Sequence, residues 1–133
     1  MTRILLLEDE PSVMKLMRLM LKPYSVIEAT TAQEALLCSI DVEFQIDLLV
    51  ADVTLPTGSG VAVARMLRSK IPALPVILTS GYPVSSWRKQ DSRELETLGA
   101  QSVQILQKPF QAQSFVHAVR ESLRELQPLP KTA

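Results

Sequence analysis

Four polar segments of this chain have residue types that could together do chemistry on a phosphoryl group. Each lies at or just beyond the end of a short apolar run, and they are Glu8-Asp9-Glu10, Asp52, Thr79-Ser80 and Lys108-Pro109. A carboxylate can attack phosphorus, but its negative charge repels the incoming phosphoryl group, so a divalent cation must offset both charges. Acids, hydroxyls and a lysine in these positions therefore indicate phosphoryl chemistry that uses a metal ion.

The elements that must position these residues follow from the hydrophobic pattern. Continuous apolar runs favour strands covered on both faces, and they occupy residues 4–7, 25–27, 47–50, 76–78 and 103–106. Longer amphipathic stretches predict helices over residues 11–22, 31–39, 60–70, 84–98 and 111–126. Alternating strands and helices form a mostly parallel sheet with helices on both faces, and such sheets bind ligands at the carboxyl ends of their strands. We therefore expect the four polar segments on one rim.

Local signals support these helix boundaries. Pro11 suits a first helical turn, and Thr31 and Glu34 have the spacing of a capping box. Gly99 is expected to end the fourth helix.

Composition limits the possible function. The 133 residues predict one domain, expected over residues 1–126, with a flexible tail over residues 127–133. The 14 basic and 14 acidic residues cancel, which gives no sign of nucleic-acid binding. No apolar run approaches the roughly 18 residues of a membrane span, and the single cysteine cannot form an internal disulfide. A cytoplasmic protein is expected.

With these motifs in this order, the sequence resembles the receiver domain of two-component response regulators. The resemblance runs from Arg3 to about Leu126. Its motifs are the acidic pair Glu8-Asp9, the pattern Asp52-x-x-x-Pro56-x-x-x-Gly60, the pair Ser80-Gly81 and the run Lys108-Pro109-Phe110. It implies a flavodoxin-like (βα)5 fold, a doubly wound parallel sheet with strand order 2-1-3-4-5. Either a free-standing regulator or the receiver of a hybrid sensor histidine kinase fits.

The resemblance also implies roles for the residues at the rim. Asp52 is the expected phosphoacceptor. The expected Mg²⁺ ligands are Asp9, Asp52 and the backbone carbonyl of Thr54, with Glu8 acting directly or through water. Lys108 is expected to pair with a phosphoryl oxygen, and the resemblance implies a cis bond before Pro109.

The hydroxyl that contacts the phosphoryl group is expected to be Ser80. Adjacent side chains of a strand face opposite sides, so Thr79 is the alternative rather than a second contact. Thr54 and Tyr82 lie two positions beyond Asp52 and Ser80, and in the family such positions tune the rate of dephosphorylation.

Two features depart from the family pattern. Ile105 stands where an aromatic switch residue is usual, and the stretch between Ser80 and Lys108 is longer than usual, with the excess in residues 84–104. The fourth helix or its flanks should therefore be unusual. Trp87 lies in this stretch beside two cations, either as an exposed partner-binding anchor or packed over the edge of the core.

Three functional classes remain open. The first is a phosphoacceptor receiver, which takes phosphate from a histidine kinase or histidine phosphotransfer protein and changes the surface around the fourth helix, fifth strand and fifth helix to control another protein. It is not an enzyme beyond assisting its own phosphorylation and dephosphorylation. The second is a haloacid-dehalogenase-like phosphatase, which typically needs a second acid where Thr54 stands. The third is a receiver-like interaction module that is not phosphorylated.

The partners expected of the first class are all proteins. Besides the phosphodonor, they comprise an unidentified downstream protein. No output domain is expected after Leu126, so direct nucleic-acid binding is not expected, nor is membrane attachment through this domain. Whether the chain forms a homodimer is left open.

Overall fold

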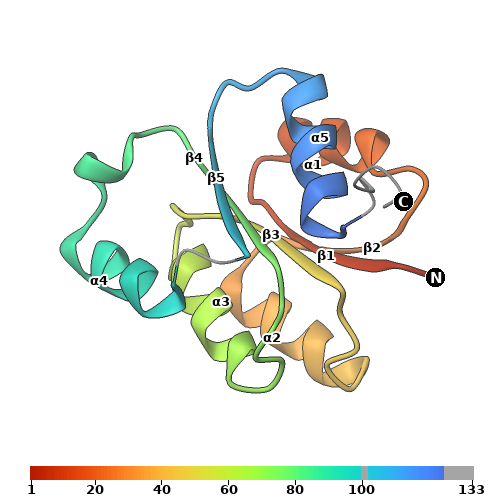
Figure 1. The fold of residues 1–133 in the computed structure, drawn as a ribbon, viewed down its shortest axis with the longest axis horizontal. Helices are drawn as coiled ribbons and strands as arrows, with labels where there is room; N and C mark the ends of the chain where they lie inside the picture. Colours follow the sequence, from red (N-terminus) through yellow and green to blue (C-terminus); the bar gives the residue numbers. More distant parts are fainter. Residues whose placement is uncertain (100–101, 125–133) are drawn as a thin grey trace, which may run out of the picture.

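The computed structural model describes residues 1–99 and 102–124 and shows five strands alternating with helices (Figure 1). The strands are β1 (Arg3–Leu7), β2 (Ser25–Ala29), β3 (Leu48–Asp52), β4 (Val76–Ser80) and β5 (Val103–Gln107). The helices are α1 (Pro11–Met20), α2 (Ala32–Asp41), α3 (Gly60–Arg68), α4 (Lys89–Leu98) and α5 (Ala112–Ser122), with a 3₁₀ turn η1 (Val84–Ser86) before α4. The predicted boundary at residue 126 and the tail lie outside the described residues.

The five strands form one parallel sheet in the order β2-β1-β3-β4-β5. This confirms the predicted strand order and fold class. The winding direction reverses between β1 and β3, which are adjacent, so the carboxyl ends of these two strands flank the place where such sheets bind ligands.

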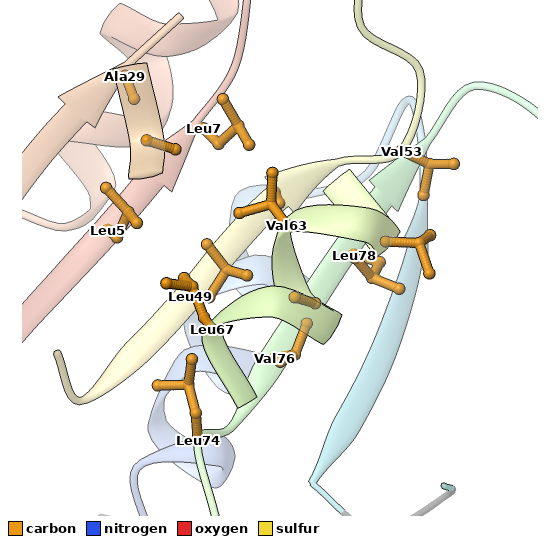
Figure 2. Close-up of a cluster of buried hydrophobic side chains, with 14 of the residues drawn as sticks. Leu5, Leu7, Ala29, Leu49, Val53, Val63, Leu67, Leu74, Val76 and Leu78 are labelled. Atoms are coloured by element: carbon orange, nitrogen blue, oxygen red, sulfur yellow. The ribbon is translucent and has the colours of Figure 1, made fainter. Parts of the chain in front are cut away.

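Helices cover both faces of the sheet, and two apolar cores result. We call the first the α2–α3 core; it contains Leu5, Leu49, Val63, Leu67 and Leu78 among its buried residues (Figure 2). The second, the α1–α5 core, contains Ile4, Met17, Val50, Ile77 and Phe115. Alternate residues of β3 and β4 enter opposite cores, because side chains alternate along a strand. Burial on both faces explains the continuous apolar runs.

The start of the fourth helix differs from the prediction. Sequence periodicity predicted one helix over residues 84–98, but the chain forms the 3₁₀ turn η1 and α4 begins only at Lys89. Trp87 and Arg88 between them are extended, with ψ near 160° and 148°. Within this segment the indole N–H of Trp87 donates to Ser80 Oγ at 3.2 Å. The predicted irregularity of this segment is thereby confirmed.

The other helix ends follow local chemistry. Thr31 Oγ1 accepts from the backbone N–H of Glu34 at 3.0 Å, as the capping-box spacing predicted. The Glu34 carboxylate accepts from the N–H of Thr30, one residue before the expected donor. Gly99 ends α4 with φ of 79°, a conformation that favours glycine.

Candidate phosphoacceptor site

Asp52 is the last residue of β3, and its side chain is buried at the rim of the sheet, 8% exposed. One carboxylate oxygen, Oδ1, accepts from the backbone N–H of Thr54 at 3.2 Å. The other, Oδ2, accepts from Lys108 Nζ at 3.0 Å. The backbone of Asp52 is packed as tightly as its side chain, because a Cβ placed at Gly60 would overlap the carbonyl oxygen of Asp52. The position of the carboxylate is thus held from both ends.

Glu8 and Lys108 meet at the same rim from distant parts of the sequence. Glu8 follows β1 and is 1% exposed. Its Oε1 accepts from Lys108 Nζ at 2.9 Å, and its Oε2 accepts from the backbone N–H of Glu10 at 3.1 Å. Lys108 follows β5, and the bond between Lys108 and Pro109 is cis. One ammonium group therefore bridges two buried carboxylates.

Burial dominates the electrostatics of these carboxylates. Burial raises the pKa of Asp52, and the hydrogen bond and charge of Lys108 offset this only in part. The pKa of Glu8 is raised for the same reason, again against the influence of Lys108. For Lys108 itself burial acts to lower the pKa, but its hydrogen bonds to Glu8 and Asp52 outweigh that effect and raise it. The ammonium of Lys108 is therefore charged, but this single positive charge does not fully offset the cost of burying two carboxylates.

A hard divalent cation would supply the additional positive charge. Glu8, Asp9 and Asp52 each offer a carboxylate oxygen, and these oxygens lie within 4.8 Å of one another. Mg²⁺ prefers six oxygen ligands at about 2.1 Å and keeps several waters, so a few carboxylates are sufficient protein ligands. The donor set is therefore suited to Mg²⁺. Thr54 is exposed on the loop beyond β3, and its carbonyl stays a predicted ligand.

The two candidate hydroxyls at the end of β4 have different surroundings. Ser80 is fully buried; its Oγ donates to the carbonyl of Tyr82 at 2.9 Å and accepts from the N–H of Tyr82 at 3.0 Å. Thr79 is also buried, but its Oγ1 has no hydrogen-bond partner in the described part of the chain. Lys108 is tied to this strand as well, because its backbone N–H donates to the carbonyl of Ser80 at 2.7 Å.

Three further residues named from the sequence are Ile105, Tyr82 and Trp87. Ile105 pairs with Leu78 in the sheet, and its side chain is 40% exposed. The Tyr82 side chain is exposed. Trp87 is half-buried and packs against the α2–α3 core, which answers the open question of its position in favour of core packing.

Sequence reasoning missed one contact of the Ser80 hydroxyl. The indole N–H of Trp87 reaches both Ser80 Oγ, at 3.2 Å, and the carbonyl of Tyr82, at 3.1 Å. No motif signals this contact, because it depends on the path of the loop between Gly81 and Arg88. Only the unusual length of the segment pointed to the region.

Fold and site together define a doubly wound α/β protein with an acidic cluster at its topological switch point. A family model described as the response regulator receiver domain matches residues 4–120. The chain belongs to this family, the receiver domains of two-component signalling.

Curated relatives agree with this assignment. Transcriptional regulatory protein KdpE of Mycobacterium tuberculosis is 32% identical over 126 residues, which are 93% of this chain and 52% of KdpE. Sensor kinase CckA of Brucella abortus is 28% identical over 92% of this chain and 12% of its own length. The chain thus spans about half the length of KdpE and a small part of CckA.

Solved structures agree as well. The receiver domain of the hybrid histidine kinase CckA is 28% identical with a TM-score of 0.73, covering 91% of this chain and 98% of that one. A receiver domain protein from Clostridium thermocellum has a TM-score of 0.76 at 22% identity, covering 95% and 97%, and supports the fold alone. Among the described residues, no helix combines the length and apolar character that crossing a membrane requires.

Proposed function

We propose that Asp52 accepts a phosphoryl group from a phosphohistidine of a histidine kinase or histidine phosphotransfer protein. The observation that carries this proposal is the buried Asp52 carboxylate, held between Lys108 Nζ and the backbone N–H of Thr54, within a cluster of acids suited to Mg²⁺. In the transfer, an Asp52 oxygen forms a bond to phosphorus as the bond from phosphorus to the imidazole nitrogen breaks. The electron pair of that bond stays on the imidazole.

The chain's own residues prepare this step by position and charge. Gly60 permits close packing of α3 on the end of β3, which fixes the backbone of Asp52. Lys108 lies 3.0 Å from the Asp52 carboxylate, so its ammonium is in place to pair with a phosphoryl oxygen once that group is attached. Glu8, Asp9 and Asp52 would hold Mg²⁺, which offsets the negative charge of carboxylate and phosphoryl group. Ser80 supplies a hydroxyl that can donate to another phosphoryl oxygen.

The output of this function is a change of surface rather than a reaction on a separate substrate. An acyl phosphate carries roughly −1.5 to −2 charges in place of the single negative charge of the carboxylate, and the added charge and bulk shift a two-state surface. We propose that the surface around α4, β5 and α5 then controls a protein partner. The chain acts in the cytoplasm in this proposal, and the only chemistry it assists is its own phosphorylation and dephosphorylation.

Intact-mass measurement tests the proposal. The protein is incubated with Mg²⁺ and a small-molecule phosphodonor, and the native chain is compared with Asp52→Asn and Asp47→Asn. Asp47 is the matched control, because it lies beside the opposite end of β3, where it accepts from the backbone N–H of Arg3 at 2.8 Å. We expect one added phosphate on the native chain and on Asp47→Asn, and none on Asp52→Asn.

Two other outcomes would reject the proposal. Absence of any phosphate adduct on the native chain, together with no binding of beryllofluoride, supports an interaction module that is not phosphorylated. Rapid multiple-turnover hydrolysis of the phosphodonor supports a phosphatase instead.

A further inference from the structure

The Ser80 hydroxyl has no hydrogen-bonding capacity left over. A serine hydroxyl has one hydrogen to donate and two lone pairs that accept. The hydrogen is directed to the carbonyl of Tyr82, and the lone pairs receive the N–H of Tyr82 and the indole N–H of Trp87. To donate to a phosphoryl oxygen on Asp52, Ser80 must therefore break its bond to the Tyr82 carbonyl. Rotation of Oγ away from this loop breaks the bond from Trp87 as well.

Trp87 is in direct contact with the Ser80 hydroxyl, so rotation of that hydroxyl changes its surroundings. Its indole N–H is shared between Ser80 Oγ and the carbonyl of Tyr82, while its ring packs against the α2–α3 core. The residue stands in the extended segment between η1 and α4. A hydroxyl at the end of β4 is thus connected through one side chain to the segment that leads into α4.

Position 105 lacks the means for a similar connection. Ile105 has no polar side-chain atom, and its side chain is already 40% exposed in this conformation. It lines a shallow groove between α4 and β5 together with Leu95 and Val103. A residue with no polar side-chain atom cannot be coupled to Ser80 through a side-chain hydrogen bond, whereas Trp87 forms such a bond.

We propose that Trp87 is a positioning residue that acts through Ser80. In the unphosphorylated chain its indole N–H helps to hold the Ser80 hydroxyl against Tyr82. When Ser80 turns to the phosphoryl group on Asp52, Trp87 loses this partner and the segment from η1 to α4 is released. This inference rests on the proposed phosphorylation of Asp52, and it identifies which segment reads that event.

Trp87 is the only tryptophan of the chain, so intrinsic fluorescence reports on it alone. We expect the emission maximum to shift to longer wavelength when Mg²⁺ and a phosphodonor are added, because the indole loses a buried partner. The shift should be absent from the phosphorylated fraction of Ser80→Ala, and intact mass measures how large that fraction is. Ile105→Ala serves as the control and should retain the shift, because position 105 takes no part in the connection.

A second variant tests the restraint itself. Trp87→Phe keeps an aromatic ring but removes the N–H donor, so Ser80 is held less firmly against Tyr82. Loss of one neutral hydrogen bond, worth about 1 kcal/mol, is expected to raise the initial rate of phosphorylation by roughly fivefold, because about 1.36 kcal/mol corresponds to a tenfold change in rate. The rate is measured by intact mass with the same phosphodonor, beside the native chain and Ile105→Ala.

The outcomes separate this inference from the function on which it rests. If the native chain gains a phosphate while its fluorescence stays unchanged, or if Trp87→Phe is phosphorylated at the native rate, the positioning role is wrong and the phosphoacceptor function stands. If the shift is lost in Ile105→Ala and kept in Ser80→Ala, position 105 carries the signal instead. If the native chain gains no phosphate, both proposals fail.

Discussion

The two halves of the site are built on different principles. The charged half, made of Glu8, Asp9, Asp52 and Lys108, joins residues that are up to 100 positions apart in the sequence. The neutral half, made of Ser80, Tyr82 and Trp87, spans only eight consecutive residues. Sheet topology brings the first half together, because the carboxyl ends of parallel strands share one rim. The second half depends on the path of a single loop, so it can differ between chains that share the same fold.

The two halves also differ in how tightly their backbones are packed, and two glycines make this testable. Gly60 abuts the charged half, where a Cβ would overlap the carbonyl oxygen of Asp52 and crowd the side chain of Ala51. Gly81 belongs to the neutral half, where a Cβ would meet nothing within 4 Å. The charged half should therefore tolerate no added atom, and the neutral half should accept one.

The largest expected effect is that of Gly60→Ala. The clash is with backbone rather than with a flexible side chain, so we expect a loss of about 3 kcal/mol in the free energy of unfolding, the upper end of the usual cost of overpacking. Gly81→Ala is the matched control, expected to be unchanged or up to about 1 kcal/mol more stable, because it restricts the unfolded chain. Urea unfolding measures both variants. Equal effects at the two positions would show that the difference in packing is not real.

Removing or adding the metal ion is expected to have the next largest effect, and only the charged half should respond. Burial raises the pKa of Asp52 and Glu8, so the folded chain holds their protons more tightly than the unfolded chain does. The resulting stability is fully present below the pKa values of the unfolded chain, about 4, and is lost as pH rises through the raised pKa values of the folded chain. In a chelator, unfolding free energy should therefore fall as pH rises through this window.

Mg²⁺ should restore stability at neutral pH by binding the ionised carboxylates of the folded chain. At a concentration 100 times its dissociation constant, the expected gain is about 2.7 kcal/mol. Urea unfolding at several pH values, with chelator or with Mg²⁺, measures both effects. Asp52→Asn is the informative variant, because it should flatten the pH dependence and weaken the response to Mg²⁺. A native chain whose stability in chelator rises with pH would contradict this account of the site.

These contrasts also explain how far the sequence could be interpreted without a structure. Five short apolar runs alternating with amphipathic stretches predicted a parallel sheet whose strand ends share one rim, and Glu8 and Lys108 meet there. The order of the strands came from the resemblance to receiver domains. The contact between Trp87 and Ser80 had no such source. Helical spacing over residues 84–98 predicted a continuous helix, whereas the chain forms η1 and an extended segment in which Trp87 contacts Ser80. Periodicity reports burial along an element, whereas it contains no information on where a loop side chain finds a partner.

The smallest effect is expected from Thr79→Val, which compares the two hydroxyls at the boundary of the halves. Thr79 lies opposite Asp52 in the sheet register and is the alternative to Ser80 as the hydroxyl that contacts the phosphoryl group. Its hydroxyl is buried without a hydrogen-bond partner in the described part of the chain. Valine has nearly the same shape and no polar atom to satisfy, so we expect a gain of about 1 kcal/mol, or roughly 3 °C in Tm. Thermal unfolding measures the gain. The variant should retain phosphorylation and the Trp87 fluorescence shift, because Ser80 is untouched. Loss of that shift with a normal phosphate adduct would make Thr79 the responding hydroxyl and would move the signal from the α2–α3 core to the α1–α5 core.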